Sequence, residues 1–457
     1  MTDTAAEGSA KAPGRFAAFS HGSFVLYFSA RVLMTFGAQI LSVAAIWHIY
    51  ELTKSAFYTG LVGLVQFVPL ALLVLVTGTA ADQFGRRLIM GLSTALAAAC
   101  AAIMVVLSYT GLINAWAMLA VLVLFGVARA FLGPASSSLV VSLVPTKDFA
   151  NAVTWNSSAW QAATIVGPAA GGLLLTFGEP TFTGWLAANG QPGLAQALNG
   201  HGPEVAYTTG FIFMILGALF VFMIPKPPKS PPRERPTLSN MLEGFRFIWR
   251  QKIILGAISL DLFVVFMGGV VALLPIYAEN ILQLGPSGLG WLRAAPGIGA
   301  IIVAAGLALF PIRDHAGKIM FVCVALFGAF TIVFGLSTIA WLSIAALICL
   351  GAADMVSVVV RETLLQLWTP DDVRGRVNAV NSVFVSASNE LGDFRAGTMA
   401  GAIGPGATGA IPAVVIGGVG AIIVAGAWSY LFPQLRLARH LDGRDQKQEA
   451  PATAAAG

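Results

Sequence analysis

The chain has 457 residues, of which 57% are hydrophobic and only 10% are charged, and its formal net charge is +5. Soluble domains carry about 25% charged residues, so this composition excludes a protein that hides its apolar surface from water by folding alone. It favours a protein whose folded surface faces a lipid bilayer.

Twelve apolar runs follow one another along the chain, and most have the roughly 20 residues that a membrane-spanning helix needs. The sequence therefore predicts an all-α membrane protein with twelve transmembrane helices. The sixth run is short, and its helix is expected to begin nearer Ala206. The runs cover residues 24–50, 58–80, 88–109, 115–144, 152–177, 210–224, 253–281, 289–310, 319–336, 340–367, 377–403 and 414–432.

The basic residues predict the orientation in the membrane. Twenty of the 26 Lys and Arg residues lie in the two terminal segments and in the loops after even-numbered helices, whereas the opposite face holds only Lys54. Cytoplasmic loops carry an excess of Lys and Arg, so both termini are predicted to be cytoplasmic. This bias accounts for the positive net charge without a nucleic-acid partner. Five arginines lie inside predicted helices: Arg31, Arg129, Arg293, Arg361 and Arg395.

A basic, proline-rich segment at 225–237 follows the sixth helix and is typical of a stiff linker. Residues 238–251 place apolar side chains at helical spacing, which predicts an amphipathic helix on the inner membrane surface. The predicted domains are a six-helix bundle over 1–224, a cytoplasmic linker with its helix over 225–251, and a second six-helix bundle with a cytoplasmic tail over 252–457.

The two halves repeat each other at an offset of 225 residues. Such long-period similarity indicates duplicated, pseudo-symmetric bundles with the functional site between them, near the middle of the membrane. In this register Arg129 corresponds to Asp354. The matched pairs are Trp116 with Trp341, Gly126 with Gly351, and Pro145 with Pro370.

The segment 178–206 is the one long loop predicted to lie outside. It contains Glu179 and Glu204 but no Lys or Arg. We expect a tolerated insertion there, with a lid over the transport path as the alternative.

Two short motifs resemble those of a known superfamily. Gly78-Thr-Ala-Ala-Asp82-Gln-Phe-Gly85-Arg86-Arg87, between the second and third helices, resembles the signature of the major facilitator superfamily. Gly167-Pro168-Ala-Ala-Gly171-Gly172 resembles the antiporter motif of its fifth helix. Other segments resemble the branch that holds the enterobactin exporter and related drug:proton antiporters. These segments include Ser259-Leu-Asp261-Leu-Phe and Ser388-Asn-Glu390-Leu-Gly-Asp393-Phe.

The first motif has a mechanical interpretation. Gly78 allows close helix contact, Gly85 allows a tight turn, and Arg86 and Arg87 are expected to reach the inner lipid headgroups. The resemblance implies that Asp82 holds the halves together at the cytoplasmic side, where a carboxylate can face the N-terminus of the eleventh helix. A topology anchor alone is the alternative.

The second motif combines small residues with a proline. Gly167, Gly171 and Gly172 favour close helix packing, and Pro168 favours a bend. The resemblance implies export, while simple helix packing is the alternative.

Five acidic residues also lie well inside predicted helices and balance the five arginines, Glu279 being left out because it lies at the outer end of the seventh helix. An isolated charge in a membrane costs about 2.5–3.5 kcal/mol, so these groups should pair and face a cavity. Arg293, Arg361 and Glu362 lie nearer the helix ends and are expected to be structural. The acidic residues are Asp261, Asp354, Glu362, Glu390 and Asp393.

The remaining charges give candidates for a transport site. Since helices 1, 4, 7 and 10 line the cavity in this superfamily, the resemblance favours Arg31 and Arg129 as cavity cations. It also favours Asp261 and Asp354 as cavity acids, and both are candidates for proton coupling, with Asp261 the runner-up to the pair that follows. Glu390 and Asp393 are three residues apart, hence on one helix face. Two neighbouring carboxylates in a low dielectric do not both ionise readily, which suits a proton carrier. Permanent salt bridges are the alternative.

No phosphate-binding GxxxxGK[ST] loop, metal-ligand cluster or nucleophile–base set is visible in the sequence. We therefore predict neither an enzyme nor a cofactor. The leading hypothesis is a monomeric, proton-coupled exporter of a siderophore-like or drug-like small molecule in the bacterial inner membrane. Its partners would be that molecule, protons and the bilayer. The alternatives are uptake of a small metabolite and a non-transporting membrane receptor.

Overall fold

The computed structural model describes residues 14–226, 238–312 and 314–437. Within these ranges every regular element is helical. The first half holds η1 (Ala17–Ser20), α1 (Gly22–Thr53), α2 (Ala56–Phe84), α3 (Arg86–Tyr109), α4 (Ala115–Val140), α5 (Thr146–Leu175), η2 (Thr176–Gly178), α6 (Pro180–Ala188), α7 (Pro192–Leu198) and α8 (Gly202–Met223). The second half holds α9 (Leu238–Arg250), α10 (Lys252–Gly268), η3 (Val271–Leu273), α11 (Leu274–Ile276), η4 (Tyr277–Ile281), α12 (Gly285–Leu309), α13 (Ala316–Leu336), α14 (Ala340–Trp368), α15 (Asp371–Ile403), α16 (Ala407–Leu431) and α17 (Pro433–Leu437).

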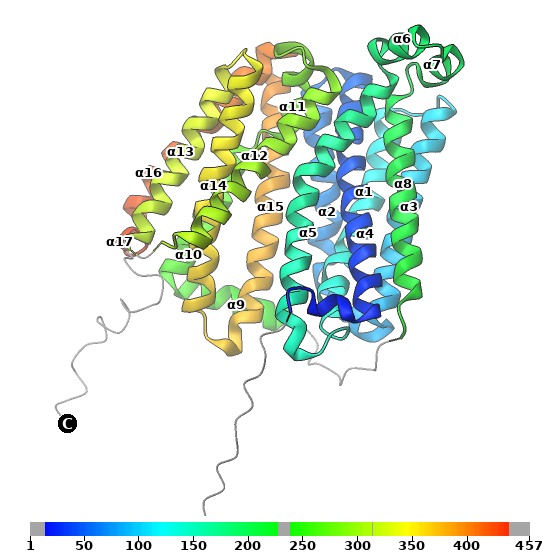
Figure 1. The fold of residues 1–457 in the computed structure, drawn as a ribbon. Coiled ribbons are helices and arrows are strands. Elements are labelled where there is room, and N and C mark those ends of the chain that lie inside the picture. The colour runs from blue at the N-terminus through cyan, green and yellow to red at the C-terminus, as the bar shows by residue number, and fades with distance from the viewer. Residues whose placement is uncertain (1–13, 227–237, 313, 438–457) are drawn as a thin grey trace, which may run out of the picture.

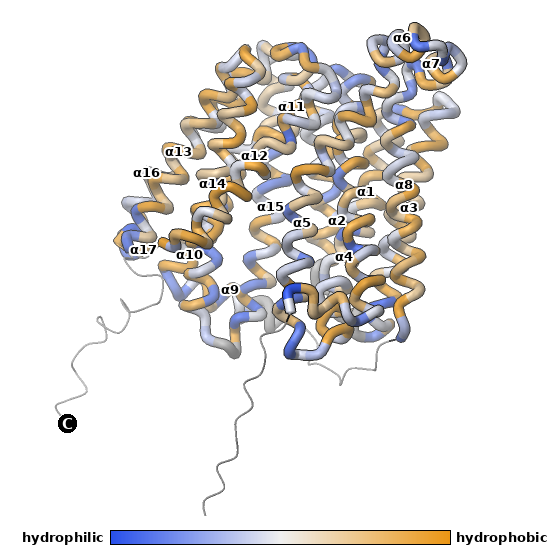
Figure 2. The backbone as a smooth tube through the Cα atoms, viewed as in Figure 1, coloured by the Kyte–Doolittle hydropathy of each residue, from blue (hydrophilic) through white to orange (hydrophobic). Residues whose placement is uncertain are grey.

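The helices have the lengths that a membrane requires. In the described part of the chain, eleven helical segments are long and apolar enough to cross a bilayer. The twelfth spanning helix of the predicted set is α15, which has 33 residues but is far less apolar because it carries several charged side chains. Figure 2 shows hydrophobic residues along the sides of the bundle and many hydrophilic residues near its ends. The all-α, twelve-helix membrane fold is confirmed.

The long helices form two bundles that meet along two helix pairs (Figure 1). In the first bundle α1 packs on α5 and α8, while α4 packs on α2 and α3. In the second, α12 and α13 pack on α14, and α16 packs on α10, α13 and α15. The main contacts between the bundles are α2 with α15 and α5 with α12.

The internal repeat is visible in where the helices begin. α4 starts at Ala115 and α14 at Ala340, a separation of 225 residues. Pro145 precedes α5 and Pro370 precedes α15 at the same offset, and each proline has the extended ψ that a residue before a helix adopts. The halves are therefore pseudo-symmetric, as the sequence predicts.

Matched glycines place equivalent helices in close contact. A Cβ atom on Gly126 would lie 2.6 Å from the backbone oxygen of Gln66 in α2, and one on Gly351 would overlap the backbone of Pro296 in α12. Glycine at both positions thus lets α4 and α14 approach their partner helices backbone to backbone.

The predicted seventh helix is not continuous. It comprises α10, a break at Gly269–Val270, and then η3, α11 and the π-helical turn η4. The loop at 178–206, which is predicted to lie outside, contains the short helices α6 and α7. The predicted amphipathic helix is α9. Its Glu243 forms an ion pair with Arg376 of α15, with 2.7 Å between Oε2 and Nη1.

Candidate functional site: a charged cavity between the bundles

A cavity of about 470 Å³ lies between the two bundles. Its walls come from α1, α2, α4 and α5 of the first bundle and from η3, α12 and α15 of the second. The lining includes three cations and two carboxylates: Arg31, Arg129, Arg293, Glu390 and Asp393. This volume falls in the usual range of roughly 300–1,000 Å³ for small-molecule sites.

One ion pair in the cavity joins the two bundles. Arg129 of α4 lies 3.4 Å from Oε1 of Glu390 in α15, and the same Nη1 donates to Gln66 Oε1 at 2.9 Å. The amide of Gln66 in turn donates to the Val62 carbonyl at 3.1 Å. A Cβ atom on Gly63 would lie 2.9 Å from Glu390 Oε2, so the glycine leaves room for the carboxylate against α2.

Asp393 lies one helical turn further along α15. Its Oδ1 accepts a hydrogen bond from the Ala272 backbone amide at 3.3 Å, in η3, just after the break that follows α10. Arg293 of α12 reaches across the boundary and donates to Ser42 Oγ of α1 at 3.2 Å. The position of Arg293 near a helix end predicts a structural role, but the structure places this arginine in the cavity wall.

Arg31 occupies a separate part of the wall. Its Nη1 donates to Ser136 Oγ at 2.8 Å, and the Ser136 hydroxyl also contacts the buried Tyr27 hydroxyl at 2.9 Å. The guanidinium carbon lies 5.8 Å from the ring centre of Trp160 in α5.

Other candidate residues lie outside the cavity lining. Asp261 of α10 forms an ion pair with Arg361 of α14, and both side chains are buried. Asp354 of α14 is also outside the lining, although it matches Arg129 in the repeat. Arg395 donates to the Phe266 and Met267 carbonyls at the end of α10, at 2.9 and 2.5 Å.

The glycine-rich motif of α5 lies at two helix contacts. A Cβ on Gly167 would be 2.6 Å from Gln39 Cβ, while Gly171 faces Val43 of the same helix, α1. Gly172 faces the other bundle, where its Cβ would be 2.7 Å from Gly290 Cα in α12.

Pro168 stands inside α5, and its carbonyl oxygen is 2.7 Å from where a Gly290 Cβ would be. The motif therefore allows α5 to pack closely against both α1 and α12.

The α2–α3 hairpin is held to its own bundle. Gly85 has φ +92°, a conformation that favours glycine. Arg86 donates to the Ser138 carbonyl at 2.9 Å, and Arg87 donates to the Val221 and Phe222 carbonyls. These contacts hold both arginines at the carbonyl ends of α4 and α8, which attract cations. Their contact with lipid headgroups stays a prediction.

Two further residues of the hairpin motif belong to α2. The side chain of Asp82 and the surroundings of Gly78 lie outside what the structure describes. The proposed latch at Asp82 therefore stays a prediction.

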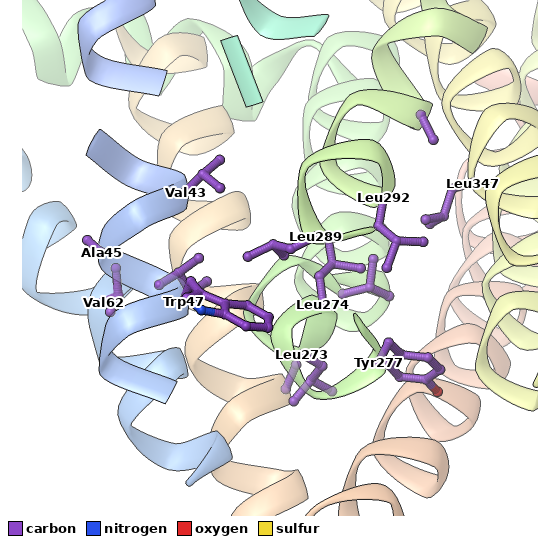
Figure 3. Packing of buried hydrophobic residues seen from close by; sticks show 14 of the residues in the cluster. Val43, Ala45, Trp47, Val62, Leu273, Leu274, Tyr277, Leu289, Leu292 and Leu347 are labelled. Carbon is purple, nitrogen blue, oxygen red and sulfur yellow. The ribbon is translucent and has the colours of Figure 1, made fainter. Parts of the chain in front are cut away.

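The bundles also meet at the end that carries α6 and α7. Here the Tyr50 hydroxyl donates to Asn280 Oδ1, and Lys54 lies 2.5 Å from Glu279. Figure 3 shows Trp47 of α1 directed toward Leu274 and Leu289 of the second bundle, within one buried hydrophobic cluster. These side chains form an apolar seal between the bundles at this end.

Two pseudo-symmetric bundles around a central cavity are the architecture of a membrane transporter. The chain belongs to the family described as transmembrane secretion effector, which matches residues 13–451. It is thus a multi-pass bacterial membrane protein of the major facilitator superfamily.

Among the relatives, the multidrug efflux pump Tap of Mycobacterium tuberculosis is 27% identical over 403 residues, covering 85% of this chain and 90% of Tap. The enterobactin exporter EntS of Escherichia coli is 27% identical over 395 residues, covering 84% of this chain and 86% of EntS. The chain therefore resembles the efflux branch that the sequence motifs indicate.

A solved structure supports the fold. A bacterial homologue of the human lysosomal transporter Spinster, in an inward-facing and unoccupied conformation, superimposes with a TM-score of 0.72. It is 17% identical, and the match covers 91% of this chain and 97% of that chain.

Proposed function

We propose that this protein is a proton-coupled exporter of a siderophore-like or drug-like amphiphile in the bacterial inner membrane. The observation that carries this proposal is the ion pair between Arg129 of one bundle and Glu390 of the other, inside the cavity. A charge pair that spans the boundary between moving parts is made in one conformation and broken in another.

The chemistry of proton coupling follows from this position. A carboxylate at membrane depth remains ionised most easily while a cation faces it. When the bundles rock apart around the cavity, Glu390 leaves Arg129 and binds a proton instead. Asp393, one turn away on the same helix, is the second carboxylate that can share this proton.

The orientation follows from the basic residues. Counts of Lys and Arg assign the end with α9 and α17 to the cytoplasm, and the end with α6 and α7 to the outside. The seal formed by Trp47, Leu274 and Leu289 then closes the outer side, so this conformation is inward-facing. In that state the cavity receives cargo from the cytoplasm.

The cargo class rests on the cavity and on the relatives. The lining mixes charged, amide and aromatic side chains with apolar ones, as an amphiphile requires. The names of the two relatives refer to drugs and to the siderophore enterobactin.

Flux in reconstituted vesicles tests the proposal. Purified protein in liposomes would be given an imposed pH gradient, and candidate siderophores and drugs would be screened for transport. We expect a cargo that moves against its gradient together with a counterflow of protons, which a pH-sensitive dye inside the vesicles records. If the transport rate of every cargo that moves were independent of the pH gradient, proton coupling would be contradicted.

A further inference from the structure

The guanidinium of Arg31 has no acidic partner among the described residues, although it lies inside the span of α1. Of the other two cavity arginines, Arg129 forms an ion pair with Glu390, and Arg293 donates a hydrogen bond to Ser42. The cavity lining has three cations and two carboxylates, so one positive charge there lacks a matching carboxylate.

A positive charge at membrane depth is costly unless an anion or a polar environment compensates it. Here the environment compensates only in part. Nη1 donates to Ser136, whereas the buried Nε has no hydrogen-bond partner. An anion in the cavity would supply the missing countercharge at the accessible end of the guanidinium.

The side chains around Arg31 fix its position. The Tyr27 and Ser136 side chains are almost wholly buried, and their hydroxyls are 2.9 Å apart, so together they hold one arm of the guanidinium. Trp160 lies beside the guanidinium, and its side chain is 49% exposed in the cavity wall. An aromatic group can stack on this exposed indole while its acid contacts the arginine.

We propose that Arg31, Ser136 and Trp160 form a subsite for an aromatic acid, which binds the anionic aromatic part of the cargo. This assignment rests on the proposed function and names the chemical class of the cargo. The subsite lies wholly in the first bundle, whereas Glu390 and Asp393 belong to the second. Cargo and proton would thus be held by opposite walls of the cavity.

Binding of two probes with the same shape and different charge tests the subsite. The probes are 2-naphthoate and its neutral carboxamide, and their affinities for the purified protein are measured by titration calorimetry at pH 7.5. A fork-shaped hydrogen bond to a charged group should favour naphthoate about tenfold or more. We expect the Arg31→Gln variant to bind the two probes with equal affinity.

Two other variants separate charge from stacking. Trp160→Ala should lower the affinity for both probes by the same factor. Arg31→Lys should keep part of the preference for naphthoate because it keeps the charge. Arg250→Gln, an exposed position on α9, is the matched control and should keep the full preference. Thermal unfolding of each variant identifies any that fails to fold.

Equal affinities of the two probes for the wild-type protein would overturn the subsite, as would a preference that persists in Arg31→Gln. Proton-coupled flux of any cargo is measured separately in the same preparation. If proton-coupled flux is found but the wild-type protein does not prefer naphthoate, only the subsite is overturned. If the preference is found and depends on Arg31 but no cargo shows proton-coupled flux, only the proposed function is overturned.

Discussion

Lys54 Nζ lies 2.5 Å from Oε1 of Glu279, and this ion pair joins the end of α1 to the π-helical turn of the other bundle. Lys54 itself has φ +48°, which turns the chain sharply between α1 and α2. The Tyr50–Asn280 hydrogen bond lies beside it. Because both contacts cross the boundary between the bundles, they stabilise the state that is closed at this end.

Removal of the ion pair should shift the protein toward the conformation that is open at this end. Since the two side chains are 54% and 30% exposed, the effect is about 1 kcal/mol or less, or up to about fivefold in the population ratio. Distances between spin labels across this end should show a larger open fraction in Lys54→Gln. The exchanged pair Lys54→Glu with Glu279→Lys should restore the wild-type distribution, and an unchanged distribution in Lys54→Gln would argue against the contact.

The glycine contact between α5 and α12 should tolerate no added side chain. In Gly172→Ala the new Cβ would meet the backbone of Gly290 and Pro286 at 2.7 Å, where neither atom can move aside easily. We expect efflux to fall several-fold while expression stays normal. Gly426→Ala in α16 is the matched control because nothing lies within 4 Å of its added atom. Equal efflux by the two variants would contradict a close α5–α12 contact.

The buried pair of Asp261 and Arg361 should act in stability rather than in coupling. Asp261→Asn removes the nearer of two countercharges of the buried Arg361, the other being Glu362 at 3.9 Å, which costs up to about 3–5 kcal/mol in the free energy of unfolding. Denaturation in detergent measures this loss, and replacing both residues by Leu should recover much of it. Proton-coupled flux per folded molecule should persist in Asp261→Asn, whereas its complete loss would make Asp261 a coupling residue.

Labelling of single cysteines tests the orientation. Both Gly85, between α2 and α3, and Ala197, in α7, are exposed. A membrane-impermeant thiol reagent added to whole cells should label Ala197→Cys but leave Gly85→Cys unlabelled until the membrane is opened. The opposite pattern would reverse the proposed topology.

Much of the fold could be predicted because a bilayer imposes simple rules on length and charge. The apolar runs indicated all the spanning helices, including α15, whose charges lower its hydropathy. The π-helical turn at Tyr277–Ile281 could not be predicted, because its hydrogen bonds depend on packing against neighbouring helices rather than on local residue preference.

The candidate site was predicted in part. The spacing of Glu390 and Asp393 indicated one shared helix face, and both residues do line the cavity. The repeat matched Arg129 with Asp354, yet Arg129 pairs with Glu390, since symmetry relates equivalent positions rather than contacting ones. The place of Arg293 in the cavity wall could not be predicted, because its position along the helix gives no information on the direction of its side chain.

The central claim is that Glu390 and Asp393 carry the exchanged proton, and a double variant tests it most directly. In vesicles with an imposed pH gradient, Glu390→Gln with Asp393→Asn should abolish uphill, proton-dependent efflux but spare downhill exchange of the same cargo. Glu362→Gln, an acid outside the cavity lining, should behave like the wild type. Uphill, proton-dependent transport by the double variant would contradict the assignment.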